Sequence, residues 1–255
     1  EELVLATTGV GGSEIWRDYM FIAESSKLHI YNPTTGSDLI SWKTWTGDEI
    51  DDAYHPMHQA KGDGSLYIGA GRFLSRLSEG TSGFNPNDSA STSYSWTAQA
   101  LDLPKGFRIR SIEEIGNYLI LGCWKRNTAG KTSSVAVIYP WNHMLQLDSH
   151  EGPISMRRYG GVSALLNINS KIFAWVGVRG EIFYYTGTGL KKIKKLPFYP
   201  GAEVAPNAVK ANFNDIPIFG IRNRTTAADI DNNRGGVYTY GTIEEGTYPW
   251  SLNLE

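Results

Sequence analysis

The sequence predicts an all-β repeat fold built from small antiparallel sheets. A short apolar run recurs five times, and a tight polar turn precedes each run. Aromatic residues make up 12% of the chain, and 28 Gly and 11 Pro residues supply many turns. The five runs lie at 20–23, 66–69, 119–122, 173–176 and 218–220.

The spacing of these runs indicates the kind of repeat. Their central residues are Ile22, Ile68, Leu121, Trp175 and Phe219, at intervals of 46, 53, 54 and 44 residues. A four-stranded β-propeller blade occupies about 40 to 50 residues, and helical repeats are mostly shorter. Helices are also disfavoured because the segments between turns are short and rich in Ile, Val, Tyr, Trp and Thr.

Each repeat is expected to hold an inner strand, the strand of the apolar run, a third strand and an outer strand. Gly, Asn or Asp residues in most of the first turns suit a tight hairpin. Inner strands are expected at 14–16, 57–61, 109–115, 162–168 and 208–213. Third strands are expected at 27–31, 72–77, 135–139, 181–185 and 236–240. Outer strands are expected at 39–45, 94–101, 144–147, 190–196 and 248–252.

The distance across the two termini predicts the number of blades. From Phe219 through the C-terminus and on from the N-terminus to Ile22 is 58 residues, which is one interval. Residues 1–255 are therefore expected to form a single domain of five blades. A strand at 3–6 would join the blade that holds 237–252 and so close the ring without open edges. Because the chain begins at Glu1, an excerpt of a longer protein with more blades stays an alternative.

The whole chain resembles a β-propeller. Leu-Tyr-Ile-Gly at 66–69 and Gly-Glu-Ile-Phe-Tyr-Tyr at 180–185 resemble the divergent propellers of tailed-phage virion and tail proteins. The resemblance implies a structural role in a virion, tail or adhesion assembly, with other protein subunits as partners and a virion or extracellular location. No WD40 or Kelch signature recurs in the repeats.

Charge and hydropathy exclude several partners. A formal net charge of -2, from 24 basic and 26 acidic residues, gives no general attraction to nucleic acid or an anionic membrane. No apolar stretch approaches the ~18 residues that cross a bilayer, so membrane insertion is not expected. The single cysteine, Cys123, is expected to be a small buried apolar residue.

One loop carries a possible calcium pattern. Asp229, Asp231 and Asn233 place oxygen atoms at alternate positions, as a hard cation requires. The following Gly comes one place late, however, and the twelfth position is Tyr240 instead of Glu. A polar hairpin loop is therefore favoured, and no cofactor is expected, with calcium as the alternative.

Two histidines lie near a group of acidic residues. His55 and His58 follow the acidic segment 48–52 and could bind zinc. Pro56 breaks any helix that would bring both rings to one face, and spacing fixes no third ligand. We expect a solvated connection between the first two blades and no metal.

Five-bladed propellers also include glycoside hydrolases, which need two carboxyl groups ~5 to 9.5 Å apart. The expected inner strands and turns offer Glu14, Asp18 and either Glu113 or Glu114. Since neighbours in a strand face opposite sides, only one of the last two is expected to point inward. The fourth and fifth inner strands have no carboxylate, so catalysis is the alternative and a non-enzymatic module is the prediction.

Tryptophans offer a second alternative, a sugar-binding module in which aromatic rings stack on the ligand. Most of them lie in expected strands, where large rings fill the wedge between blades, and this core role is favoured. The five repeats are also too divergent for one identical sugar site in each blade. The tryptophans concerned are Trp42, Trp45, Trp96, Trp141 and Trp250.

Two long polar loops, 125–133 and 222–234, interrupt the second hairpins of the third and fifth blades. Superposable blades would place both loops on one rim, where function on such scaffolds usually resides. They are the expected contact surface with other proteins. Their basic residues are Lys125, Arg126, Lys131, Arg222, Arg224 and Arg234. The lysine-rich run 191–195 is instead expected to protect an outer edge strand from pairing.

Overall fold

The computed structural model confirms an all-β chain of four-stranded antiparallel sheets. It describes residues 10–24, 26–50, 54–88, 92–125, 135–145, 152–156, 161–177, 181–195, 202–211, 217–223, 236–239 and 250–252. Within these ranges there are five sheets, and in each one the four strands follow their order in the sequence.

The strands of the five sheets have the following bounds. The first sheet holds β1 (Val10–Trp16), β2 (Tyr19–Glu24), β3 (Lys27–Asn32) and β4 (Ser37–Thr44). The second holds β5 (Met57–Gln59), β6 (Leu66–Ala70), β7 (Phe73–Glu79) and β8 (Tyr94–Asp102). The third holds β9 (Phe107–Ile115), β10 (Tyr118–Lys125), β11 (Val135–Asn142) and β12 (Ile154–Met156). The fourth holds β13 (Val162–Ile168), β14 (Lys171–Val176), β15 (Glu181–Tyr185) and β16 (Leu190–Lys195). The fifth holds β17 (Ala202–Ala211), β18 (Pro217–Asn223), β19 (Gly236–Thr239) and β20 (Trp250–Leu252).

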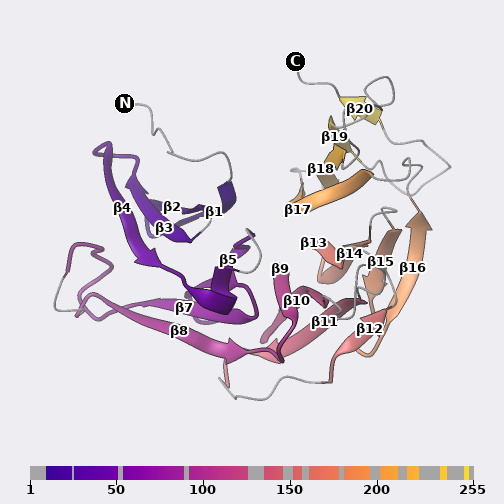
Figure 1. Ribbon diagram of the computed structural model, residues 1–255, viewed down its shortest axis with the longest axis horizontal. Coiled ribbons are helices and arrows are strands. Elements are labelled where there is room, and N and C mark those ends of the chain that lie inside the picture. Colours follow the sequence, from indigo (N-terminus) through magenta and orange to yellow (C-terminus); the bar gives the residue numbers. More distant parts are fainter. Residues whose placement is uncertain are drawn as a thin grey trace.

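The sheets follow one another around an arc, with their first strands toward the middle (Figure 1). The first strands β9 and β13 contact each other, as do β13 and β17, so consecutive sheets meet at their inner edges. The first and last sheets lie at the two ends of the arc. The strand expected at 3–6 lies outside the described residues, so closure of the ring stays a prediction.

The predicted hairpin turns between the first two strands are confirmed in the first and fourth sheets. Arg17 and Asp18 join β1 to β2 with φ of 51° and 64°, and Asn169 and Ser170 join β13 to β14 with φ of 50° and 60°. Positive φ at both central residues is the geometry that matches the twist of a two-residue hairpin. These turns place the inner strand of each sheet directly beside its second strand.

The outer strand expected at 144–147 is wrong. The third sheet ends instead with the three-residue strand β12, which pairs with β11. Asn142 closes a turn after β11, because its side-chain Oδ1 accepts the N–H of Leu145 at 3.3 Å. His143, which lies in that turn, is fully buried. The chain therefore turns away from the sheet at Met144 and Leu145, the apolar residues that suggested a strand.

The core lies between sheets, because the second strands β6 and β10 are buried on both faces. In β6, Leu66 and Ile68 pack in the cluster between the first and second sheets, while Tyr67 packs between the second and third. In β10, Ile120 and Leu121 likewise belong to different clusters. This burial explains the continuous apolar runs in the sequence, since a strand covered on both sides loses the polar alternation.

The predicted core role of the tryptophans is confirmed where their side chains are described. Trp45 and Trp141 are buried. Trp42 and Trp96 are partly buried against the apolar cluster between the first and second sheets. Trp250 lies in β20, and nothing is described of its side chain. Cys123 is also buried, which raises the pKa of its thiol. The only helix in the described ranges is the 3-10 turn η1 (Gly47–Ile50), and no described helix has the length and apolar character to cross a membrane.

Candidate functional site

A group of ionisable side chains gathers at the inner strands of the second and third sheets. The ring of His58 in β5 lies between two carboxylates of β9: its Nδ1 is 3.8 Å from Glu113 Oε1 and its Nε2 is 3.8 Å from Glu114 Oε2. Nε2 of His143, which follows β11, is 3.4 Å from Glu114 Oε1. We call His58, Glu113, Glu114 and His143 the histidine–glutamate cluster.

Glu114 connects the third sheet to the second. Its carboxylate accepts the backbone N–H of Lys61 at 2.7 Å and that of Gly62 at 3.1 Å, both in the β5–β6 turn. Burial would raise the pKa of Glu114, but the nearby His58 and the two N–H donors lower it to about 2. Glu114 is therefore ionised at neutral pH and holds the turn in place.

The close approach of this turn favours a glycine at position 62. A Cβ at Gly62 would lie 3.0 Å from the sulfur of Met144 and 3.1 Å from Nε2 of His143. Both distances are shorter than the ordinary van der Waals contact of a Cβ atom, so a side chain at this position would have to displace its neighbours. The sequence Gly-Asp-Gly at 62–64 therefore serves packing against the third sheet as well as the turn.

Glu113 connects the third sheet to the fourth. Its Oε2 accepts the backbone N–H of Asn167 in β13 at 3.1 Å, and its Oε1 accepts the N–H of Glu114 at 3.0 Å. Asn167 returns a bond, since its Nδ2 donates to the carbonyl of Glu114 at 2.6 Å. All four carboxylate oxygens of Glu113 and Glu114 thus accept a main-chain N–H.

A second polar group adjoins the cluster and was missed from the sequence. The hydroxyl of Tyr67 donates to Asp63 Oδ2 at 2.8 Å, and an Nη of Arg76 lies 3.1 Å from the same oxygen. Burial and the nearby Asp63 raise the pKa of Tyr67. The Tyr67 ring meets the edge of His143, with centroids 5.8 Å apart. Asp63 between two glycines was the available signal, and its partner Tyr67 is only four residues away.

The three carboxylates considered for glycoside hydrolysis have different surroundings. Glu14 is half-buried on β1, and its carboxylate accepts the N–H of Ile15 at 3.3 Å. Asp18 is exposed in the β1–β2 turn. No interaction described in the structure joins either residue to Glu113. The expectation that only one of Glu113 and Glu114 points inward was too simple, because both carboxylates reach His58.

The solvated connection expected around His55 and His58 is wrong for both rings. His55 is fully buried and stacks on Trp45 with ring centroids 4.0 Å apart, while its Nδ1 is 3.0 Å from the carbonyl of Gly69. His58 belongs to the histidine–glutamate cluster. Asp48 is exposed, as expected, and pairs with Arg72 at 3.3 Å. The reason is that Pro56 and Gly69 bring this segment against β6 instead of leaving it in solvent.

The described ranges contain no group of three His, Cys, Asp or Glu side chains arranged to hold a metal ion. The calcium candidates Asp229, Asp231 and Asn233 lie outside those ranges. The calcium alternative therefore stays a prediction.

Most of the expected contact residues also lie outside the described ranges. These are Arg126, Lys131, Arg224 and Arg234. Lys125 is exposed at the end of β10, with its Nζ 5.0 Å from the ring centroid of Phe107. Arg222 lies in β18, and nothing is described of its side chain. The lysine-rich run forms the outer strand β16, as expected, and Lys192 pairs with Glu181.

The fold is shared with solved structures at low sequence identity. The extracellular domain of a one-component system from B. thetaiotaomicron matches with a TM-score of 0.56 and 11% identity over 95% of this chain and 29% of its own. An α-L-arabinofuranosidase from Lactobacillus brevis matches with a TM-score of 0.53 and 12% identity over 93% and 91%. An exported protein from Bacteroides fragilis matches with a TM-score of 0.51 and 10% identity over 96% and 71%.

These similarities show a β-propeller-like all-β fold and nothing finer. The chain spans less than a third of the first of these proteins. No protein-family model and no curated protein sequence matches the chain. None of the three structures is a phage tail protein, so the resemblance to tail propellers stays a prediction.

Proposed function

We propose that this chain is a non-enzymatic interaction module, a five-bladed propeller closed by its terminal segments that acts in an extracellular or virion assembly. The observation that carries the proposal is the hydrogen bonding of Glu113 and Glu114. Their four oxygens accept main-chain N–H groups of the third sheet and of its two neighbours. These carboxylates brace three sheets against one another.

This use of the carboxylates argues against hydrolysis of a glycosidic bond. A general acid in such an enzyme needs a raised pKa so that it holds a proton at neutral pH. The pKa of Glu114 is instead lowered to about 2. Glu113 would have to give up the N–H of Asn167 to reach a substrate, which would remove one of the hydrogen bonds between β9 and β13. A glycoside hydrolase, like the arabinofuranosidase of similar fold, is the alternative function, and the activity assay below tests it.

Exposed apolar residues support the interaction role. Met144 and Leu145 are 43% and 63% exposed, although large apolar side chains on a monomer surface are normally scattered. The sulfur of Met144 lies beside Gly62 in the β5–β6 turn. Trp16 donates to the carbonyl of Gly64 in the same turn, and its neighbour Ile15 is 64% exposed. We propose this end of the molecule, together with the basic rim loops, as the surface that meets other subunits.

The enzymatic alternative is tested with a panel of nitrophenyl glycosides that includes the α-L-arabinofuranoside. We expect no turnover by the unmodified protein above a heat-denatured control. Turnover that disappears in Glu113→Gln, while circular dichroism shows an intact fold, would overturn the proposal. Asp38→Asn is the matched control, since Asp38 carries an exposed carboxylate on the outer strand β4 and is not a candidate for catalysis.

The interaction role is tested by photo-cross-linking in the particle or larger protein that contains this chain. A photoreactive residue at position 145 is expected to cross-link to another subunit or domain. The same residue at position 40 is the control, because Ile40 is equally exposed at 67% but lies on the outer strand β4. Equal yields from both positions, or none from position 145, would contradict the proposed surface.

A further inference from the structure

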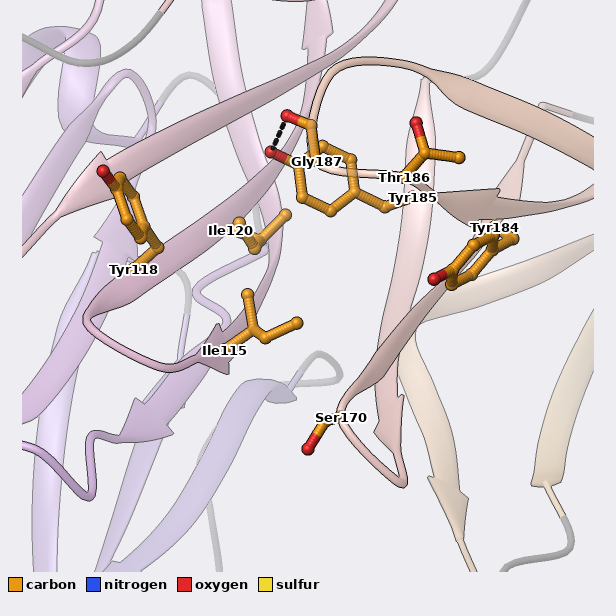
Figure 2. Close-up of a pocket in the computed structure, with 8 residues that line it drawn as sticks. All are labelled: Ile115, Tyr118, Ile120, Ser170, Tyr184, Tyr185, Thr186 and Gly187. Carbon is orange, nitrogen blue, oxygen red and sulfur yellow. Dashed lines mark hydrogen bonds between the residues drawn. The ribbon is translucent and has the colours of Figure 1, made fainter.

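A pocket of about 390 Å³ opens between the third and fourth sheets, and no residue of the histidine–glutamate cluster lines it. Figure 2 shows Tyr118 of β10 on one side and Tyr184 of β15 on the other, with Ile115 and Ile120 between them. The volume is near the lower end of the ~300 to 1,000 Å³ typical of small-molecule sites. The pocket therefore suits one small ring and not an extended chain.

The rigid parts of the pocket are apolar and aromatic. Ile120 is 1% exposed and belongs to the cluster between the two sheets. Tyr185 is 8% exposed, and its hydroxyl donates to the carbonyl of Gly187 at 2.8 Å, which fixes the ring (Figure 2). Tyr118 and Tyr184 are half-buried, so part of each ring remains open to a ligand. Aromatic rings of this kind offer large contact area with little conformational freedom to lose.

Polar groups at the pocket are neutral. Ser170 lies in the β13–β14 turn, and Thr186 begins the β15–β16 turn. Both residues are exposed. The hydroxyl of Thr186 donates to the carbonyl of Gly189 at 3.1 Å and accepts its N–H at 3.0 Å, so Ser170 supplies the rim hydroxyl. Among the described residues that line the pocket, none carries a charge. An anionic or cationic ligand would lose water there without gaining an opposite charge.

We infer that this pocket binds a neutral sugar ring. A sugar presents C–H groups that pack on tyrosine and isoleucine side chains, and hydroxyl groups that pair with the hydroxyls of Ser170 and Tyr184. The site is made by residues of two sheets that differ from repeat to repeat, so it needs no copy in the other blades. This removes the objection that five divergent repeats cannot form a sugar-binding module.

The inference goes beyond the proposed function and does not depend on it. Binding at this pocket is measured by methyl signals and affinity, whereas the enzymatic test measures turnover at Glu113. A protein that binds sugars without hydrolysing them satisfies both, and either can fail alone.

Methyl NMR of protein labelled at isoleucine δ1 positions tests the site directly. The probes are methyl β-D-glucopyranoside, methyl β-D-galactopyranoside, methyl α-D-mannopyranoside and methyl α-L-arabinofuranoside. We expect at least one probe to shift the signals of Ile115 and Ile120 saturably, with a Kd on the order of 1 mM. Signals of Ile15 and Ile40, which are exposed in the first sheet, should stay in place. The two pocket signals are identified by their loss in Ile115→Val and Ile120→Val.

Substitutions and a charged probe sharpen the result. Tyr184→Ala and Tyr118→Ala are each expected to weaken binding by about tenfold, since each removes one aromatic wall. Tyr31→Ala is the matched control, because Tyr31 is also half-buried but lies at the end of β3. Methyl β-D-glucuronide should bind at least about tenfold more weakly than the matching glucoside, because its carboxylate finds no cation.

Three outcomes would overturn the inference. The first is that no methyl glycoside shifts Ile115 and Ile120 in folded protein. The second is that Tyr31→Ala weakens binding as much as Tyr184→Ala. The third is that p-cresol, which has an aromatic ring but no array of hydroxyl groups, saturates the same signals while every sugar fails; the pocket would then be a general aromatic site.

Discussion

Neighbouring sheets meet in two chemically different ways, near the inner strands and near the outer ones. At the inner strands of the second, third and fourth sheets, contacts are polar and go through Glu113, Glu114 and Asn167. At the outer strands of the first and second sheets, contacts are aromatic. There Phe84, from the loop after β7, lies 6.3 Å from Trp42 of β4 and 6.0 Å from Tyr94 of β8 between ring centroids.

The difference follows from the geometry of sheets that spread from a centre. Inner strands lie close together, so short side chains can reach the main chain of the next sheet and satisfy its N–H groups. Outer strands diverge, and only large rings fill the widening space. The inner contacts should therefore depend on ionisation and on every partner, whereas the outer contacts should depend on volume.

Removing the inner carboxylate should have the largest effect. Glu114→Ala leaves the N–H groups of Lys61 and Gly62 without their acceptor and removes the carboxylate 3.8 Å from His58 Nε2, and we expect a loss of ~3 kcal/mol in the free energy of unfolding. Urea denaturation followed by tryptophan fluorescence measures it. Glu14→Ala, at a half-buried carboxylate that bonds only its own neighbour among the described interactions, should cost less than ~0.5 kcal/mol.

Removing the outer ring should come next. Phe84→Ala is expected to cost ~2 kcal/mol, below the range for fully buried Phe because Phe84 is partly exposed. Phe84→Leu should recover part of the loss, since it restores volume without a specific bond. If Leu is as damaging as Ala, ring geometry and not volume decides, and the contrast with the inner strands weakens.

Acid should weaken the inner contacts selectively. The folded-state pKa of Glu114, about 2, lies below its ordinary value of 4.5, so its contribution is present above about pH 4.5 and is lost as pH falls toward 2. The stability difference between the unmodified protein and Glu114→Gln should therefore narrow over that interval. The deficit of Phe84→Ala should keep its size as long as the protein remains folded. Urea midpoints at a series of pH values compare the two.

The smallest effect is expected at the lysine above the outer aromatic group. Nζ of Lys43 lies 4.6 Å from the ring centroid of Trp42 and 5.5 Å from that of Tyr94. Lys43→Gln should cost ~0.5 to 1 kcal/mol by removing a cation from these ring faces. Lys27→Gln, at an exposed position of β3, is the control and should be neutral. Equal costs at the two positions would show that general surface charge is responsible.

The repeat and its second strands could be predicted because burial on two faces leaves a direct mark on the sequence. Leu66 to Ala70 and Leu119 to Cys123 have no exposed position, so each reads as a continuous run. β13 was predicted at Val162–Ile168, where the structure has it. The strand β12 was missed because three residues carry no periodicity, while Met144 and Leu145 imitate an apolar strand.

The candidate sites could be predicted only in part. Glu113 and Glu114 were singled out because they are carboxylates on an inner strand. Their partners could not be found, since Lys61 and Asn167 are each more than 50 residues away and the register between sheets leaves no mark on either segment. The pocket beside Tyr118 and Tyr184 also depends on how two neighbouring sheets are placed against each other, which the sequence does not reveal.

The double burial of β10 has a consequence for how the molecule opens. Because Ile120 and Leu121 belong to different cores, unfolding of either adjoining sheet uncovers one face of the third sheet but leaves the other packed. Hydrogen exchange should accordingly be slow in β10, because opening of one adjoining sheet leaves its other face packed.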